Sequence, residues 1–270
     1  MNKNVLKIGF IGCGKMAGAI IKGIRTSKNR DKFELIGSEV NREIAFLAST
    51  KLGIDVISDN VELAKRADVI VIATKPMYVL NVIESIKSVL DSNKLLISIA
   101  AGVSTSKINT ILPEHRIVRV MPNTPALLGV GMAGVAAGVN ATVDDVNFVM
   151  ELMNCVGKSI QIDEKQIDVL TAVSGSGPAF FYQVIEDMAR AGEKLGLDYE
   201  KSLLLATQTA LGSAQMVANR GDLSVQDLID NVATKGGCTF VGIQTMKDKE
   251  SDKLFAKVIA DTTKKASELG

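Results

Sequence analysis

The sequence GCGKMA at residues 12–17 constrains the fold of this chain more than any other feature. It follows the apolar run 5–11, which has the composition of a β-strand, and it opens a segment at 15–27 with helical periodicity. A G-x-G-x-x-G/A turn between a strand and a helix is the dinucleotide-binding fingerprint. Gly12 permits the tight turn, and Gly14 lets a pyrophosphate approach the backbone N–H groups at the helix N-terminus. The segment therefore predicts a Rossmann domain.

The first half of the chain alternates apolar runs with helical segments. Further strands are expected at residues 33–37, 54–57, 68–74, 94–100 and 116–121, with helices between them at 41–52, 60–66, 78–90 and 104–111. Repeated βαβ units of this kind predict a parallel sheet with helices on both faces. We expect an α/β Rossmann dinucleotide-binding domain at residues 1–163.

From residue 164 onward the sequence shows helical patterns and almost no strand patterns. Helices are expected at 166–173, at 179–195, from Asp198 to about 219, after Ser224, and from Ser251 toward the C-terminus. Asp198 and Ser251 are expected N-caps, and Ser224 with Asp227 resembles a capping box. Residues 164–270 are therefore expected to form an all-α helical domain, and the apolar helix, the glycine clusters and the resemblance described below assign substrate binding and dimerisation to it.

The expected helix at 199–219 is apolar on more than one face. Its apolar residues are Leu203, Leu204, Leu205, Ala206, Ala210, Leu211, Ala214, Met216 and Val217. A helix that is apolar nearly all round must be buried nearly all round. We infer that a second subunit covers part of it; the alternative is a central helix in a monomeric bundle.

The charge balance and the cysteines exclude several classes of function. With 31 basic and 30 acidic side chains and no Trp, the chain gives no reason to expect nucleic acid as a partner. Cys13, Cys155 and Cys238 form no CxxC pair, so neither a disulfide framework nor a metal site is expected. The apolar runs are too short or too interrupted by glycine to cross a membrane. We expect a cytoplasmic protein without a nucleic-acid, membrane or metal partner.

The end of the expected second strand bears on the choice of dinucleotide. An acid there binds the ribose hydroxyls of NAD, whereas an arginine accepts the 2′-phosphate of NADP. Glu39 favours NAD, while Ser38, Asn41 and Arg42 favour NADP, so both cofactors stay open. Lys75 follows the fourth strand at a carboxyl end, where cofactors bind; the alternative is a solvated surface lysine.

Three further clusters combine small residues with a strand end or a helix start. They are MPNTP at 121–125, SGSGPA at 174–179 and TKGGCT at 234–239. Backbone N–H groups at such places bind anions and carbonyls. The chain has a single histidine, His115, and no nucleophile elbow or HExxH motif. Chemistry carried by a cofactor hydride fits this scarcity of catalytic side chains.

Together these motifs resemble the pyrroline-5-carboxylate reductase family. The matching segments, in family order, are IGFIGCGKMAGAI at 8–20, ATKP at 73–76, SIAAGV at 98–103, RVMPNTPAL at 119–127, SGSGPAFFY at 174–182 and DNVATKGGCT at 230–239. The resemblance implies reduction of a cyclic imino acid, L-1-pyrroline-5-carboxylate, to L-proline with NADPH, or with NADH, as the final step of proline biosynthesis. It also implies a homodimer through the helical domain, assembled into larger rings such as a decamer.

The motifs and the resemblance together nominate site residues in both halves. The expected cofactor-binding residues are Gly12, Gly14, Lys15, Met16, Ser38, Arg42, Asn60, Lys75, Ala101, Asn123 and Asn231. The expected substrate-binding residues are Thr234, Gly236, Gly237, Cys238, Thr239 and Ser176. Thr239 and Glu164 are the expected catalytic residues; for Thr239 the alternative is a helix cap.

One departure and two rival functions accompany the resemblance. The family usually reads SPGGTT or TPGGCT in its last motif, whereas Lys235 here replaces the proline, which bears on the geometry of that loop. One rival is another Rossmann imine or β-hydroxyacid reductase, which would rely on a helical-domain lysine such as Lys194 or Lys201. The other is a non-catalytic NADP-binding sensor, which would not need a substrate cradle.

Overall fold

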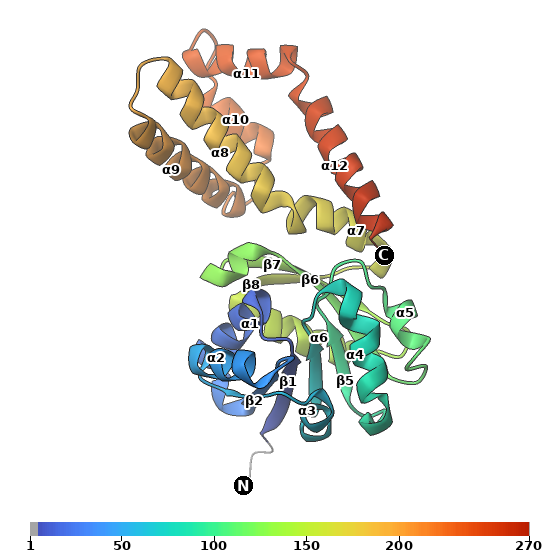
Figure 1. Ribbon diagram of the computed structural model, residues 1–270. Helices are drawn as coiled ribbons and strands as arrows, with labels where there is room; N and C mark the ends of the chain where they lie inside the picture. Colours follow the sequence, from blue (N-terminus) through green and yellow to red (C-terminus); the bar gives the residue numbers. More distant parts are fainter. Residues whose placement is uncertain (1–4, 270) are drawn as a thin grey trace. The chain divides into compact units, whose positions relative to one another are not determined.

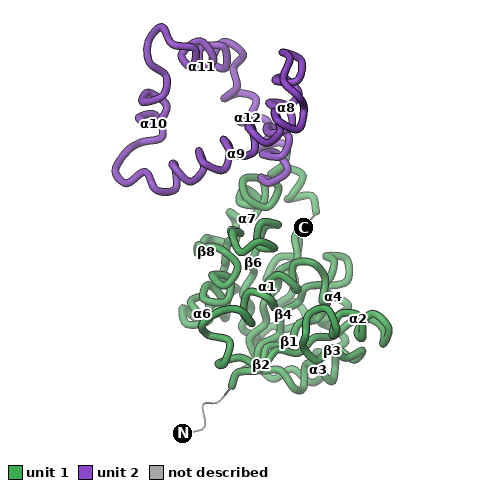
Figure 2. The backbone as a smooth tube through the Cα atoms, turned by 90° about the vertical axis from the view of Figure 1, so that its left-hand side faces the viewer, with its two compact units in different colours: residues 1–176, 262–270 green, residues 177–261 purple. Residues whose placement is uncertain are grey.

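The structure is a computed structural model, and it describes residues 5–269 (Figure 1). Its internal contacts divide the chain into unit 1, Met1–Ser176 with Thr262–Gly270, and unit 2, Gly177–Asp261 (Figure 2). The boundary expected at residue 163 follows the change from strand to helix patterns rather than packing, and it stays a proposal. Residues 1–4 and 270 of those expected domains lie outside the described part of the chain.

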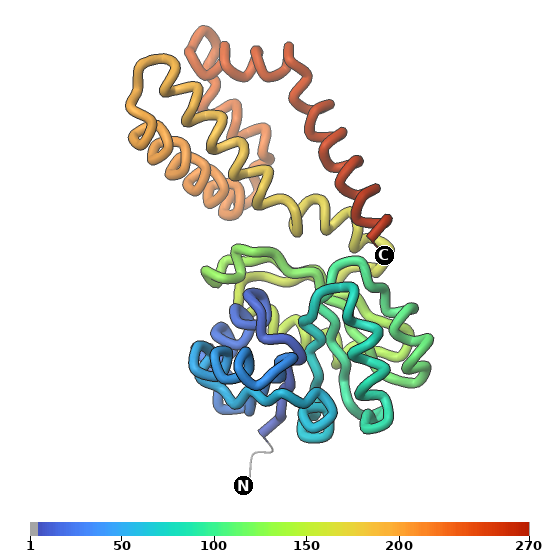
Figure 3. Tube along the Cα trace, in the orientation of Figure 1, coloured from blue at the N-terminus to red at the C-terminus, as the bar shows by residue number. Residues whose placement is uncertain are grey.

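Unit 1 is built on an eight-stranded sheet of order β3-β2-β1-β4-β5-β6-β7-β8. The strands are β1 (Leu6–Ile11), β2 (Phe33–Ser38), β3 (Asp55–Ile57), β4 (Val69–Ile72), β5 (Leu95–Ser98), β6 (Arg116–Pro122), β7 (Gly131–Ala137) and β8 (Gly157–Gln161). Neighbouring strands are parallel except β6 and β7, which are antiparallel. The expected Rossmann fold is confirmed, and the colours of Figure 3 follow the chain through it.

Helices cover both faces of this sheet. They are α1 (Lys15–Thr26), α2 (Arg42–Leu52), α3 (Asn60–Arg66), α4 (Val79–Ile86), α5 (Thr105–Asn109), α6 (Val143–Met153) and α7 (Ile167–Leu170). Side chains alternate between faces along a strand, so Val71 packs in a core with α1 and α6 while Ile70 packs in a second core with α3 and α4. The parallel strands β1 to β6 thus share one carboxyl edge, on which the site is built.

The strands β7 and β8 differ from the expectation that the strand series closes at 116–121. The β7 sequence GMAGVAA lacks the alternation that marks a strand. The small residues serve close packing instead: a Cβ on Gly134 of β7 would collide with Leu170, and a Cβ on Gly157 of β8 would collide with the backbone of Gly131 in β7. Contacts from distant segments therefore dictate this composition, and a local pattern could not reveal it.

Unit 2 holds the helical part of the chain. Its helices are α8 (Gly177–Lys194), α9 (Tyr199–Ala218), α10 (Val225–Val232), α11 (Cys238–Asp248) and the first part of α12 (Ser251–Glu268). The side chain of Asp198 accepts the Lys201 N–H at 3.1 Å, and the capping box of Ser224 and Asp227 is present, as expected. Ser251 is the first residue of α12 rather than its cap.

Helix α9 leaves large apolar side chains uncovered within the single chain. Leu204 is 69% exposed and Met216 is 62% exposed, whereas only Ser202 and Ala206 of this helix are buried. A central helix of a monomeric bundle would be buried nearly all round, so that alternative is wrong. The uncovered apolar surface instead has the character of a protein–protein interface. In the described part of the chain, no helix combines the length and the apolar content needed to cross a membrane.

Candidate functional site

The glycine turn after β1 forms a cradle that is open in front of Gly14. Gly12 has φ +90°, and a Cβ there would lie 2.9 Å from the Ala73 carbonyl oxygen. A Cβ on Gly14 would meet nothing within 4 Å, so the space in front of this residue is open. Gly14 is the N-cap of α1, which has no side-chain cap and no acidic residue in its first turn. The helix N–H groups therefore face a space that suits the pyrophosphate of a dinucleotide.

The end of β2 lies beside this turn. The Gly12 N–H donates to the Ser38 carbonyl at 2.9 Å, and the buried Ser38 hydroxyl donates to Asn60 Oδ1 at 2.7 Å. Glu39 accepts the Cys13 N–H at 2.7 Å. The structure thus brings the predicted cofactor residues Gly12, Ser38 and Asn60 together at one edge of the sheet.

The same edge carries hydroxyls that lack a protein partner. Thr74 follows β4 and Ser98 ends the neighbouring strand β5, and in residues 5–269 both hydroxyl oxygens are buried without a hydrogen bond. Buried polar groups normally have a partner. A ligand bound at this edge would supply the hydrogen-bond partners that the two hydroxyls lack. The open space at Gly14 is consistent with the same ligand. Lys75, also predicted to bind the cofactor, is exposed beside Thr74.

Asn123, at the end of β6, uses both ends of its amide within the protein. Its Oδ1 accepts the Met132 N–H at 2.8 Å, and its Nδ2 donates to the Ser174 carbonyl and hydroxyl at 3.2 and 3.3 Å. Ser174 belongs to a π-helical turn, Thr171–Gly175, a geometry that recurs at functional sites. Ser176 follows this turn directly. The predicted contact of Asn123 with the cofactor therefore competes with a structural role and stays a proposal.

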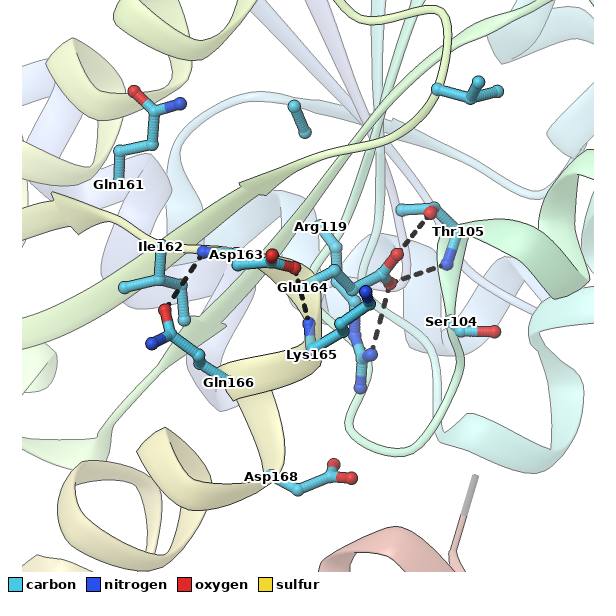
Figure 4. Close-up of a pocket in the computed structure, with 12 residues that line it drawn as sticks. Ser104, Thr105, Arg119, Gln161, Ile162, Asp163, Glu164, Lys165, Gln166 and Asp168 are labelled. Atoms are coloured by element: carbon cyan, nitrogen blue, oxygen red, sulfur yellow. Dashed lines mark hydrogen bonds and ion pairs between the residues drawn. The ribbon is translucent and has the colours of Figure 1, made fainter.

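Glu164 lines a pocket of unit 1 together with Thr105 and Arg119 (Figure 4). Its Oε1 accepts the Thr105 N–H at 2.8 Å and an Arg119 N–H at 3.2 Å, and its Oε2 accepts the Thr105 hydroxyl. The Arg119 side chain is 8% exposed and that of Glu164 is 22% exposed. Both carboxylate oxygens are thus occupied by protein donors, and the network ties the start of α5 to the segment before α7.

Arg119 and Thr105 were not among the residues predicted from the sequence. A signal was available, because Arg119 stands inside RIVRV, an otherwise apolar strand pattern. A buried arginine needs a carboxylate partner, so its presence in a strand predicts a paired acid nearby. Which acid provides the pair depends on the fold, since Glu164 lies 45 positions later.

In unit 2, residues Thr234–Gly237 form a tight turn at the start of α11. The Gly237 N–H donates to the Thr234 carbonyl at 2.9 Å, and Gly236 has φ +83°. Lys235 therefore occupies the second position of a turn with a left-handed third residue, the place where type II turns favour proline. The turn itself explains why the family motif carries proline there, and lysine is compatible with it.

Gly237 is the N-cap of α11, so Thr239 is its second helical residue and the alternative of Thr239 as the cap is wrong. The helix has no side-chain cap and no acidic residue in its first turn. Its first N–H groups are therefore available to an anion such as a carboxylate. Cys238 is exposed, and Asn231 lies on the preceding helix α10.

Known proteins match the whole chain. Residues 7–102 match a family model described as NADP oxidoreductase, coenzyme F420-dependent, and residues 164–269 match one described as pyrroline-5-carboxylate reductase dimerisation. A pyrroline-5-carboxylate reductase of Methanosarcina acetivorans is 36% identical over 265 residues, 98% of each chain. The structure of such a reductase from Coxiella burnetii has a TM-score of 0.91 at 34% identity and covers 99% of both chains. One from Plasmodium falciparum with NADP bound has a TM-score of 0.85 at 35% identity, again over 99% of both.

Proposed function

The chain belongs to the pyrroline-5-carboxylate reductase family, and we propose that it reduces L-1-pyrroline-5-carboxylate to L-proline with NADPH, or with NADH, as hydride donor. The observation that carries this function is the open glycine cradle at Gly12 and Gly14, in a chain that is related to these reductases over its full length. The cofactor, when bound, supplies a hydride to the imine carbon, and the imine nitrogen gains a proton. The chain's own residues bind, orient and enclose the reactants.

Residues at the carboxyl edge of the sheet in unit 1 bind the cofactor. The N–H groups after Gly14 hold the pyrophosphate, and the Ser38–Asn60 pair with Arg42 borders the adenosine ribose. The other proposed cofactor-binding residues are Lys15, Met16, Lys75, Ala101, Asn123 and Asn231. These residues bind and position a dinucleotide, because none of them needs to exchange a proton with the substrate.

The substrate-binding role falls to the start of α11. The N–H groups of Cys238 and Thr239, which follow the N-cap Gly237, donate hydrogen bonds to the substrate carboxylate, and the positive end of the helix dipole favours this anion. The Thr239 hydroxyl hydrogen-bonds near the ring nitrogen, where the positive charge of a protonated imine is lost on hydride addition. Thr234, Gly236, Cys238 and Ser176 complete the proposed substrate residues.

Glu164 acts through the residues that it holds. Both of its carboxylate oxygens accept hydrogen bonds from Thr105 and Arg119, which favours a positioning role over proton transfer. Thr105 starts α5, two positions after the end of the segment 98–103 that carries Ala101. We therefore assign to Glu164 the task of fixing the loop that presents the Ala101 backbone.

The assembly and the location of the enzyme complete the proposal. The uncovered apolar face of α9 supports a homodimer through the helical domain of residues 164–270, and the family resemblance extends this to a decamer. A reducing cytoplasm suits three free cysteines. Another imine or β-hydroxyacid reductase, or a cofactor sensor, is not favoured, because the full-length relatives are pyrroline-5-carboxylate reductases.

A spectrophotometric assay tests this function. Purified protein is mixed with pyrroline-5-carboxylate and either NADPH or NADH, and loss of the reduced nicotinamide absorbance is followed. We expect loss that requires the imine. Absence of loss with both cofactors contradicts the proposal, whereas loss with a β-hydroxyacid's keto product instead of the imine favours the first rival.

A further inference from the structure

A groove along α1 is lined by basic side chains and, within the described chain, by no acidic one. Its volume of about 510 Å³ is that of a small-molecule site. Within residues 5–269, its four cations form no ion pair. A concave surface with one sign of charge concentrates ions of the opposite sign. The four cations are Lys15, Lys22, Arg25 and Lys51.

Helix periodicity and a close contact between two helices bring these cations to one groove. Lys15 and Lys22 are seven positions apart on α1, so they lie on the same face of this helix. Gly18 lies between them, and a Cβ there would be only 3.2 Å from Leu52 Cδ2 at the end of α2. The missing side chain lets α2 approach, and Lys51 of α2 therefore lines the same groove.

The Arg25 side chain is held in place by the C-terminus of α2. Its Nη1 donates to the Leu52 carbonyl, and a Cβ on Gly53 would lie 2.7 Å from the same nitrogen. Among the described residues, the other guanidinium N–H groups have no protein acceptor. A guanidinium that is oriented in this way can bind a phosphate through two parallel hydrogen bonds.

The basic end of the groove is separate from the place proposed for the dinucleotide phosphates. With a rise of 1.5 Å per residue, Lys22 and Arg25 lie about 10 and about 15 Å along α1 from Lys15, at the helix start. Close to that start, Glu39 accepts the Cys13 N–H at 2.7 Å, and its negative charge disfavours an additional anion there. A second anion is therefore favoured at the far end of the groove.

We propose that Lys22, Arg25 and Lys51 form a binding site for a phosphate chain, such as tripolyphosphate, that is filled together with the dinucleotide site. Three cations around one groove attract several adjacent negative charges more strongly than a single one. The described lining has no aromatic side chain on which a base could stack, so the chain of phosphates is recognised rather than a nucleoside. This site has no part in the reduction of the imine.

Titration calorimetry with tripolyphosphate in the absence of divalent cations tests this inference. The titration is repeated at rising NADP⁺ concentrations. Two separate sites couple only weakly, so the apparent Kd of tripolyphosphate should level off at no more than about threefold above its value without NADP⁺. A Kd that keeps rising in proportion to NADP⁺ would show that both ligands compete for the glycine turn, which overturns the proposal, as does an absence of binding.

Charge-removing variants locate the site. Lys22→Gln and Lys51→Gln should each weaken tripolyphosphate binding by about threefold, and the double variant by about tenfold, with NADP⁺ binding unchanged. Lys65→Gln is the control, because this exposed lysine lies on α3, which packs in the other core of the sheet. Equal weakening by the control and by the groove variants contradicts the assignment.

A comparison of ligands tests the chemistry that is recognised. Inorganic phosphate should bind about tenfold more weakly than tripolyphosphate, because it offers fewer charges to the three cations. Adenosine triphosphate, added to the NADP⁺-saturated protein, should bind no more tightly than tripolyphosphate. Clearly tighter binding of the nucleotide would overturn the assignment to a phosphate chain alone. These titrations contain no imine, so their outcome is independent of whether the chain reduces pyrroline-5-carboxylate.

Discussion

Thr105 donates its backbone N–H to Oε1 of Glu164 at 2.8 Å, across 59 positions of sequence, and its hydroxyl to the other oxygen of the same carboxylate. The pair joins the loop after β5 to the segment before α7. Arg119 completes it from the middle of β6, with 8% of its side chain exposed. A single carboxylate thus neutralises a buried arginine and fixes a loop on the carboxyl edge of the sheet.

Replacing Glu164 should therefore reduce stability and activity together. Glu164→Gln leaves Arg119 without its charged partner and loses an acceptor for Thr105, which we expect to cost about 1–3 kcal/mol of unfolding free energy. Urea denaturation measures this cost. Glu114→Gln, an exposed change in a loop, is the control and should stay within about 0.5 kcal/mol. A positioning role also predicts a raised KM for the cofactor, and a loss in kcat with unchanged KM values would argue for a catalytic role instead.

The turn at Thr234–Gly237 should gain stability from proline. Lys235→Pro presets the backbone at the second turn position and restricts the unfolded chain, so we expect an increase of about 0.4–1 kcal/mol in the free energy of unfolding. Gly236→Ala should have the opposite effect, since φ +83° is strained for alanine. If Lys235→Pro destabilises the protein, the turn does not have the type II form.

Thr239 should affect the rate more than the fold. If its hydrogen bond strengthens in the transition state, Thr239→Ala should lower kcat by about 10²–10³-fold. Thr245→Ala is the control, because Thr245 lies on the same helix and its hydroxyl donates to the Val241 carbonyl of that helix at 3.0 Å. Steady-state kinetics at saturating cofactor measure both variants. Equal turnover in the two would remove Thr239 from the reaction.

Stability should fall at alkaline pH because of Cys13. Its thiol pKa is raised from 9.0 to about 12, chiefly by burial and then by the charge of Glu39. Between these values the unfolded chain has lost the thiol proton that the folded chain keeps, so the unfolded state gains stability as the pH rises. We expect the free energy of unfolding to decline above about pH 9, and to decline less in Cys13→Ala. Identical pH profiles for the two proteins would contradict this assignment.

A charge on the uncovered face of α9 should disrupt the assembly. Leu204 is 69% exposed in the single chain, and burying a glutamate against a second subunit is costly, so Leu204→Glu should shift the protein toward smaller species. Light scattering after size exclusion gives the mass. Phe46→Glu on α2, where the phenylalanine is 71% exposed in unit 1, is the control and should leave the mass unchanged. An unchanged mass for Leu204→Glu would place the subunit interface elsewhere.

The sequence predicted those parts of the molecule whose signals are local. The glycine turn, the strands β1 to β6 and the caps at Asp198 and Ser224 follow from motifs within a few residues, and the structure has them. The strand β7 was not predicted, because its glycines are required by close contacts with Leu170 and Gly157, which lie elsewhere in the sequence.

The site residues divide in the same way, into those that a local motif predicted and those whose contacts depend on the fold. The residues of the β2 tip were predicted from the motif, yet that Glu39 binds the Cys13 N–H and that Glu164 pairs with Arg119 could be known only from the fold. Asn123 illustrates the point for a single residue, since a motif names it but its amide serves Met132 and Ser174.

Transfer of an isotope from cofactor to product tests the central claim most directly. Cofactor carrying deuterium at C4 of the nicotinamide, prepared in both stereochemical forms, is incubated with the protein and pyrroline-5-carboxylate, and the product is analysed by mass spectrometry. The account predicts proline that carries one deuterium at C5 with one of the two forms. Cofactor consumption without deuterated proline from either form would contradict hydride transfer to the imine carbon.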